Sequence, residues 1–215
     1  MQCMPYRAVF FTLTSNPALS RAVFRFRTEL FVDHLGWSLP MHNGIERDQF
    51  DTSGATYCAL LDGDAVIGCF RAISCDEAYL SRSIFPHLAT TRQYPTSPDA
   101  LEISRFGVAE EHQSAGLTLY GLMLRLALPR SVNALVAIVE LSHERLLGKI
   151  GLRTVRYGDV HIVGFRNDGS WILAVAGEIP LSPESQPRLA KILQLTQHMD
   201  IVDETDVRRR TLLSA

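Results

Sequence analysis

Three carboxylates and a large aromatic surface stand together in the stretch LGWSLPMHNGIERDQFD, residues 35–51. The acids are Glu46, Asp48 and Asp51, and the aromatic residues are Trp37 and Phe50. Solvated acidic loops seldom carry so much aromatic surface, because its exposure to water is unfavourable. Carboxylates beside apolar surface need cationic partners to offset the loss of water. The stretch therefore indicates a site with a positively charged counterpart.

Arginines inside apolar segments are the candidate partners. Arg27 lies in a helical pattern, Arg71 lies in VIGCFRAIS, and Arg105 shares LEISRFGV with Glu102. A single arginine on a strand is usually an edge residue with its guanidinium in water, and ERDQFD alone is compatible with a capped turn. Several charges that interrupt apolar elements are costly unless they pair. The economical arrangement is one network, in which Arg71 and Arg105 meet Asp48, Asp51 and Glu102.

The apolar strand predicted at 100–109 determines where its polar side chains should point. Successive residues of a strand face opposite sides of a sheet. This alternation predicts Glu102, Ser104 and Phe106 on one face and Arg105 on the other.

Hydrophobic periodicity predicts the elements that must position these residues. A helix over 16–37 has Pro17 near its start, and two apolar runs around Asp62-Gly63-Asp64 predict a hairpin over 56–74. A short helical piece is predicted at 83–89 and a loop at 90–100. Further strands are predicted at 6–14, 100–109, 134–141, 160–165 and 171–177, and further helices at 114–130, 142–152 and 182–199, with a frayed end at 206–215. This order predicts an α/β (α+β) three-layer sandwich with a mixed, twisted central sheet flanked by helices.

Bulk composition is that of an ordinary globular protein. The 215 residues suit a single domain, 1–215, with a core over about 5–180 and a helical tail over 181–215. A net charge of -2 gives no drive toward nucleic acid or an anionic membrane. Cys58 and Cys69 lie in apolar runs and are predicted to be reduced core residues. Because no signal peptide, metal-ligand spacing or apolar run near the ~18 residues of a bilayer span is evident, a cytoplasmic protein without a metal is expected.

Two segments resemble the GCN5-related N-acetyltransferase fold. ISRFGVAEEHQSAGLTLYGLMLRLAL is similar to its central strand, loop and helix, and SHERLLGKIGLRTVRYG to its later helix and turn. Members of that family bind the pyrophosphate of coenzyme A with backbone N–H groups at a helix start. Here Gln113 and Gly116 occupy a near match to the phosphate-binding loop, and a plain glycine-containing helix start is the alternative interpretation.

A second resemblance covers residues 20–155 and rests on a series of motifs. They are Arg27-x3-Phe31-x5-Trp37, Glu46-x-Asp48-Gln-Phe-Asp51, Arg71, Phe85-Pro, and Glu102-x-Ser104-Arg105-Phe106. In order and spacing this pattern resembles the acyl-homoserine-lactone synthases, the autoinducer synthases of bacterial quorum sensing. The resemblance implies acyl transfer from an acyl thioester, on acyl-carrier protein or coenzyme A, to the amine of S-adenosyl-L-methionine. Lactone closure with release of methylthioadenosine would follow. The acyl thioester and S-adenosyl-L-methionine would both be substrates, so no cofactor is implied.

The resemblance also implies roles for individual residues. Glu102 is the expected general base, directly or through a water, and backbone N–H groups at 103–106 are candidate donors to the oxyanion. Aromatic faces would stabilise the sulfonium cation. The expected catalytic residues are Glu102, Ser104, Arg105 and Arg71, and the expected substrate-binding residues are Arg27, Phe31, Trp37, Asp48, Asp51, Phe85 and Phe106.

Some features depart from this family or leave alternatives open. AISCDEAYL, residues 72–80, stands where the family carries an LLPT-like tetrapeptide. A basic group on the later helix and strand, Arg145, Lys149, Arg153 and Arg156, is either a docking site for an acidic carrier protein or a solvated face. The competing functions are a GCN5-related acyltransferase that acts on another amine and a catalytically silent binding protein.

Overall fold

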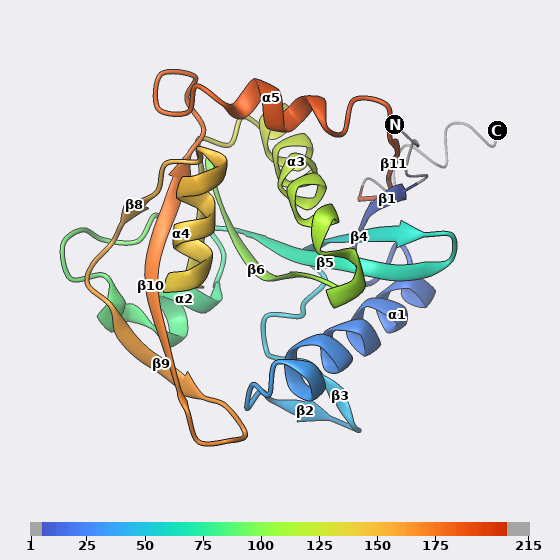
Figure 1. Ribbon diagram of the computed structural model, residues 1–215, viewed down its shortest axis with the longest axis horizontal. Helices are drawn as coiled ribbons and strands as arrows, with labels where there is room; N and C mark the ends of the chain where they lie inside the picture. Colours follow the sequence, from blue (N-terminus) through green and yellow to red (C-terminus); the bar gives the residue numbers. More distant parts are fainter. Residues whose placement is uncertain (1–5, 206–215) are drawn as a thin grey trace.

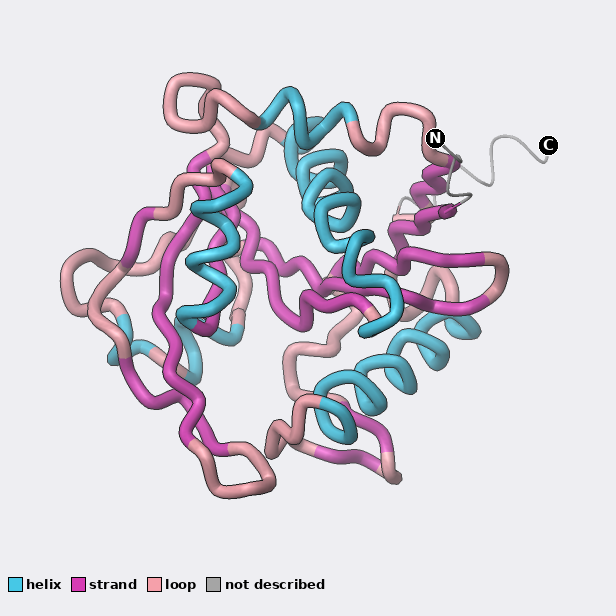
Figure 2. The backbone as a smooth tube through the Cα atoms, viewed as in Figure 1, coloured by secondary structure: helices cyan, strands magenta, loops and turns pink. Residues whose placement is uncertain are grey.

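A nine-stranded mixed sheet is the centre of the computed structural model, which describes residues 6–205 (Figures 1 and 2). The strand order is β11-β1-β4-β5-β6-β7-β10-β8, and β9 also pairs with β10. The β1–β11 and β6–β7 pairs are parallel and the others are antiparallel. The strands are β1 (Tyr6–Phe11), β4 (Thr56–Asp62), β5 (Ala65–Ser74), β6 (Ala100–Val108), β7 (Ala134–Glu140), β8 (Val155–Arg156), β9 (His161–Phe165), β10 (Trp171–Pro180) and β11 (Asp200–Asp203).

Helices cover both faces of this sheet and enclose two apolar clusters. In Figure 1, α3 lies above the β4–β5 hairpin and α1 lies below it. One face carries α1 (Pro17–Arg27), a π-helical segment (Thr28–His34) and α2 (Leu80–Ile84). The other carries α3 (Gly116–Ala127), α4 (Leu141–Ile150) and α5 (Leu189–Gln194). The short ribbon β2 (Met41–His42) and β3 (Ile45–Glu46) stands apart from the sheet. The predicted three-layer α/β architecture is confirmed.

The first helix begins as predicted and ends earlier as an α-helix. Asn16 caps it, since its side chain accepts a hydrogen bond from the Leu19 N–H, and Pro17 occupies the first turn. After Arg27 the backbone widens into a π-helix over Thr28–His34. The continuous α-helix predicted over 16–37 is therefore wrong beyond residue 27, because hydrophobic spacing does not reveal a change in hydrogen-bond register.

The hairpin and the reduced cysteines follow the sequence prediction. The β4–β5 turn places Gly63 at φ +57°, a conformation that glycine adopts without strain. Cys58 and Cys69 are free and fully buried, in agreement with their predicted place in the core.

β6 and β7 separate soon after they begin. They pair only through Ala100–Ala134, Leu101–Leu135 and Glu102–Val136, although β6 continues to Val108 and β7 to Glu140. Figure 1 shows β6 turning away from β10, the strand on the other side of β7. Beyond Glu102, the backbone of β6 therefore has no neighbouring strand on its β7 side within the described part of the chain.

The C-terminal segment differs from its prediction. Only Leu189–Gln194 of the predicted helix at 182–199 forms an α-helix, and β11 follows it as a parallel partner of β1. The frayed end predicted at 206–215 lies outside the described residues. No helix within 6–205 combines the length and apolar character needed to cross a bilayer.

Candidate active site

Three arginines and three carboxylates form a closed ring between α1, the sheet and residues 35–51, which we call the front loop. In order around the ring, every neighbour pair is joined by an ion pair or hydrogen bond: Arg27, Glu46, Arg105, Asp48, Arg71, Asp51 and back to Arg27. None of these six side chains is more than 7% exposed. The ring is neutral because positive and negative groups alternate in equal number, which reduces the cost of burying charge.

Bidentate contacts dominate the ring. Arg27 places its two terminal nitrogens 2.7 and 2.9 Å from the Asp51 carboxylate, and its Nε is 2.5 Å from Glu46. Arg71 is 2.5 and 3.1 Å from the two oxygens of Asp48. Arg105 donates to Glu46 through Nε at 3.0 Å and through a terminal nitrogen at 2.8 Å. Such paired donors fix both distance and orientation, so the ring joins the front loop firmly to β5 and β6.

The ring fixes the charge of Asp51. Burial alone would raise the pKa of Asp51, but the hydrogen bond and charge of Arg27 and the charge of Arg71 outweigh it and hold the pKa well below its usual range. Burial, together with the charge of Asp51, raises the pKa of Tyr57, whose hydroxyl donates to Asp51 at 2.9 Å. Asp51 is therefore a permanent anion at neutral pH.

A β-bulge in β6 changes which face of the sheet some of its side chains occupy, compared with the prediction from alternation. Arg71 pairs with Ser104 and Cys69 with Gly107, so Phe70 opposes both Arg105 and Phe106. Arg105 has φ +53°, an uncommon value for a residue with a side chain. The extra residue turns Arg105 to the α1 face, where it enters the ring. The prediction that alternation separates Arg105 from Glu102 and Ser104 is therefore wrong.

Phe106 consequently lies on the opposite face from Glu102. Its ring centroid is 4.6 Å from that of Tyr120 and 5.7 Å from that of His143, on the side covered by α3 and α4. Ser104 keeps its predicted face, and its hydroxyl accepts a hydrogen bond from Arg71 Nε at 3.1 Å.

Glu102 lies outside the ring, so the prediction that it joins Arg71 and Arg105 in one network is wrong. Its two oxygens accept from the Leu80 N–H at 2.9 Å, from the Ser81 N–H at 2.6 Å, and from the Ser81 hydroxyl. The side chain is buried, and burial raises its pKa above the ordinary value, although the hydrogen bonds from Ser81 and Leu80 partly offset this effect. Glu46 and Arg27 occupy the ring instead.

Trp37 and Phe31 form an aromatic pair at the C-terminal end of the first helix and the start of the front loop. Their planes are stacked at an angle of 22° with centroids 5.3 Å apart. Phe31 is 1% exposed, whereas the buried Trp37 Nε1 has no hydrogen-bond partner. Buried donors normally have a partner, so the Trp37 Nε1 is an unusual, unsatisfied donor. Phe85, at the end of α2, packs against the same apolar cluster as Phe31.

The loop that carries Trp37 is also fastened to the β9–β10 hairpin. Trp37 forms an isolated antiparallel bridge with Arg166, and the Asn167 N–H donates to the Gly36 carbonyl at 2.7 Å. The Ser38 N–H reaches the Phe165 carbonyl at 3.4 Å. Trp37 is therefore held by its stacking on Phe31 and by this hairpin.

Sequence reasoning missed the contacts that depend on backbone atoms. Ser81 and the amide of Leu80 hold Glu102, and neither was expected at the site. His161 was also missed, and its buried Nε2 has no partner, as for Trp37. No motif marks these positions, and only the tertiary placement of α2 and β9 reveals them.

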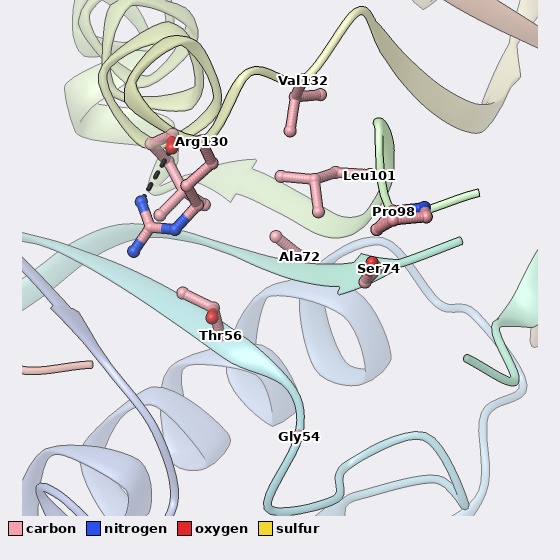
Figure 3. Close-up of a pocket in the computed structure, with 9 residues that line it drawn as sticks. Gly54, Thr56, Ala72, Ser74, Pro98, Leu101, Arg130 and Val132 are labelled. Atoms are coloured by element: carbon pink, nitrogen blue, oxygen red, sulfur yellow. Dashed lines mark hydrogen bonds between the residues drawn. The ribbon is translucent and has the colours of Figure 1, made fainter. Parts of the chain in front are cut away.

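A cavity of about 200 Å³ lies elsewhere, on the α3 side of the sheet (Figure 3). Its wall includes Ala72, Leu101 and Val132, and Arg130 donates to the Leu126 carbonyl at 2.7 Å beside it. No ring residue lines this cavity. It is therefore separate from the constellation around Glu102 and Trp37.

Comparisons with known proteins identify the family of the chain. The sequence pattern of the autoinducer synthase family matches residues 11–186. The acyl-homoserine-lactone synthase of Aeromonas hydrophila is 33% identical over 144 residues, which cover 63% of this chain and 70% of that protein. The corresponding synthase of Aliivibrio fischeri is 29% identical over 154 residues, 67% of this chain and 80% of that protein.

Solved structures show the same fold. TofI, in a ternary complex with an inhibitor and MTA, superposes with a TM-score of 0.72 at 26% identity over 88% of this chain and 99% of that one. BjaI, a CoA-dependent synthase solved with SAM and isopentyl-CoA, gives a TM-score of 0.79 at 20% identity over 96% and 99%. A putative N-acetyltransferase from Lactobacillus plantarum gives 0.51 at 15% identity over 81% and 98%. The chain thus belongs to the autoinducer synthase family of acyl-homoserine-lactone synthases, which are acyltransferases.

Proposed function

We propose that the protein transfers an acyl group from an acyl thioester to the amine of S-adenosyl-L-methionine and then closes the lactone with release of methylthioadenosine. The observation that carries this proposal is the charge ring, which joins Glu46, Asp48 and Asp51 of the front loop to α1, β5 and β6, while Phe31 lies against Gly107 of β6. Both substrates are intracellular metabolites, so we place the reaction in the cytoplasm, with residues 6–205 acting as one catalytic unit.

The ring acts through the shape that it imposes on the site. Arg27, Asp48 and Asp51 were expected to bind substrate, and Arg71 and Arg105 were expected to be catalytic. Each is nearly buried and is paired with its ring neighbours. We assign all five, with Glu46, the role of positioning residues that hold the front loop closed.

The aromatic pair supplies the pocket for the sulfonium nucleoside. An aromatic face attracts a cation through its quadrupole, most strongly in a desolvated site. Trp37 offers such a face and an unpartnered Nε1 donor for a polar atom of the nucleoside. Phe31 lies beneath Trp37 and sets its orientation. Phe85, across the same apolar cluster, contacts the acyl group.

Glu102 is the proposed general base. The substrate ammonium must lose a proton before its nitrogen can attack the thioester carbonyl, and a buried carboxylate with a raised pKa is suited to accept it near neutral pH. A carboxylate offers about four lone-pair sites, and three hydrogen bonds occupy three of them. The remaining site on Oε2 accepts the proton directly or through a water.

The separation of β6 from β7 provides donors for the tetrahedral intermediate. Backbone N–H groups at 103–106 on the β7 side of β6 are not used by a neighbouring strand. An oxyanion placed there would be stabilised by donors already in position. Collapse of the intermediate expels the thiolate and leaves the amide. The methionine carboxylate then attacks the γ-carbon, breaks its bond to sulfur and forms the lactone.

The acyl donor is a thioester of coenzyme A or of an acidic acyl-carrier protein. Lys149, Arg153 and Arg188 line a surface cavity of about 550 Å³ at the C-terminal end of α4, and a positive cavity suits either donor. Arg156, by contrast, is paired with Glu144 at 2.5 Å. The docking surface is therefore smaller than the basic group predicted from sequence.

The decisive experiment is product analysis with purified protein. The protein is incubated with S-adenosylmethionine and a panel of acyl thioesters, each presented on coenzyme A and on carrier protein. We expect stoichiometric methylthioadenosine and an acyl-homoserine lactone by mass spectrometry with at least one donor. Absence of methylthioadenosine across the whole panel would refute the proposed function.

A further inference from the structure

The segment that departs from the family pattern, AISCDEAYL, leads directly into the residues that hold Glu102. Sequence resemblance left this departure without an explanation. In the structure, α2 begins at Leu80, and its first two residues supply every hydrogen bond that the Glu102 carboxylate accepts from the described residues. Ser81 is 0% exposed and Glu102 is 1% exposed, so water does not compete for these contacts.

One of the three donors depends on the side chain at position 81. The N–H groups of Leu80 and Ser81 would be present with almost any residue type. The Ser81 hydroxyl is different, because it lies on the same carboxylate oxygen as the Ser81 N–H and would be lost with any apolar side chain. Two donors on Oε1 and one on Oε2 restrict rotation of the carboxylate.

We propose that Ser81 is a positioning residue for this enzyme: its hydroxyl fixes the orientation of the Glu102 carboxylate and stabilises its ionised form, leaving one lone pair of Oε2 for the incoming proton. This inference rests on the proposed function, in which Glu102 is the general base. In the catalytic step the proton leaves the substrate ammonium and ends on Glu102, while the Ser81 hydroxyl keeps its own proton throughout.

The Ser81 hydroxyl lowers the pKa of Glu102. Burial raises the pKa of Glu102, and hydrogen bonds from Ser81 and Leu80 lower it again. Removing the hydroxyl must therefore raise the pKa further. A smaller fraction of the enzyme would then carry the ionised base at a given pH, and the acidic limb of the rate profile would move to higher pH.

The test compares Ser81→Ala with Ser83→Ala, an exposed serine on the same helix. The Glu102 carboxyl is titrated by ¹³C NMR, with its signal assigned by difference from Glu102→Gln. We expect Ser81→Ala to raise the midpoint by about one to two units, the range expected for a hydrogen bond to a charged group. Ser81→Thr should stay close to wild type because it retains the hydroxyl, and Ser83→Ala should be unchanged.

Kinetics provide the second measurement. The acidic limb of kcat/KM should move with the NMR midpoint in Ser81→Ala, with little change in KM for S-adenosylmethionine. A midpoint in Ser81→Ala that coincides with wild type would overturn the inference. If Ser81→Ala does not fold, Ser81→Cys, which keeps the volume and is a weak donor, should raise the midpoint in the same direction. The NMR titration needs no turnover, so it decides the role of Ser81 even if the proposed function fails.

Discussion

Replacing Asp51 with asparagine removes one negative charge from the ring and leaves the volume nearly unchanged. Asp51 accepts hydrogen bonds from Arg27, Arg71 and Tyr57. After the change, three buried arginines would face two carboxylates. The amide would also direct N–H groups toward guanidinium donors, which cannot accept them.

The magnitude follows from the burial of these groups. The side chains of Arg27, Arg71 and Asp51 are at most 1% exposed, and removing one partner from a buried ion pair costs about 3–5 kcal/mol. We therefore expect Asp51→Asn to lower the free energy of unfolding by about that amount. Asp203→Asn is the matched control, because Asp203 is 48% exposed and lies 3.3 Å from Arg130. Its ion pair should contribute only about 0–1 kcal/mol.

The assay is urea unfolding followed by tryptophan fluorescence and far-UV circular dichroism, with coincident transitions as the test of two-state behaviour. The double variant Arg27→Met/Asp51→Asn removes one charge of each sign and leaves the other four ring members balanced. It should cost less than the sum of the single changes, with a coupling of about 1–3 kcal/mol. A loss for Asp51→Asn no larger than that for Asp203→Asn, or strict additivity in the double variant, would refute the ring as a linked electrostatic unit.

Three further predictions test the site. Glu102→Gln should abolish methylthioadenosine release while the circular dichroism spectrum stays unchanged; turnover near wild type would exclude the general-base role. Trp37→Phe keeps an aromatic face and removes Nε1, so it should raise KM for S-adenosylmethionine less than Trp37→Ala does; equal values would contradict stacking. Because the pKa of Asp51 is lowered in the folded protein, its contribution to stability should be complete above about pH 4 and should disappear as the pH falls through the folded-state value. Urea midpoints measured from pH 7 to pH 3 should therefore fall more in wild type than in Asp51→Asn.

Elements with local signals could be predicted from the sequence. The helix start at Asn16 and Pro17 and the turn at Gly63 each depend on the preferences of a few adjacent residues. The pairing of Arg71 and Arg105 with acids of the front loop was also predicted, because buried charges need partners. The need for a partner shows which charged residues must pair, but it does not show which acid pairs with which arginine.

The remaining contacts depend on tertiary register. Alternation placed Arg105 on the wrong face, because a bulge is set by the pairing between β5 and β6. Arginines were the predicted partners of Glu102, but its partners are chiefly backbone N–H groups. Every residue type except proline has such a group, so the sequence does not mark them. The four-residue strand β11 forms only because β1 offers it an edge. These contacts join residues that are far apart along the chain.

The tether between the Trp37 loop and the β9–β10 hairpin has a consequence for changing substrate preference. Asn167 and Gly36 are joined by a backbone hydrogen bond, although they are far apart in sequence. The tip of the turn between β9 and β10, residues 168–170, is solvent-exposed, so substitutions or inserted residues are more readily accommodated there than at Arg166 and Asn167, which hold the Trp37 loop. The peptide groups at Arg166 and Asn167 connect this turn directly to the backbone of Gly36 and Trp37. Because Trp37 is the proposed nucleoside contact, we expect libraries that vary this outer turn to alter which nucleoside analogues are accepted, while every proposed substrate-contacting residue keeps its identity.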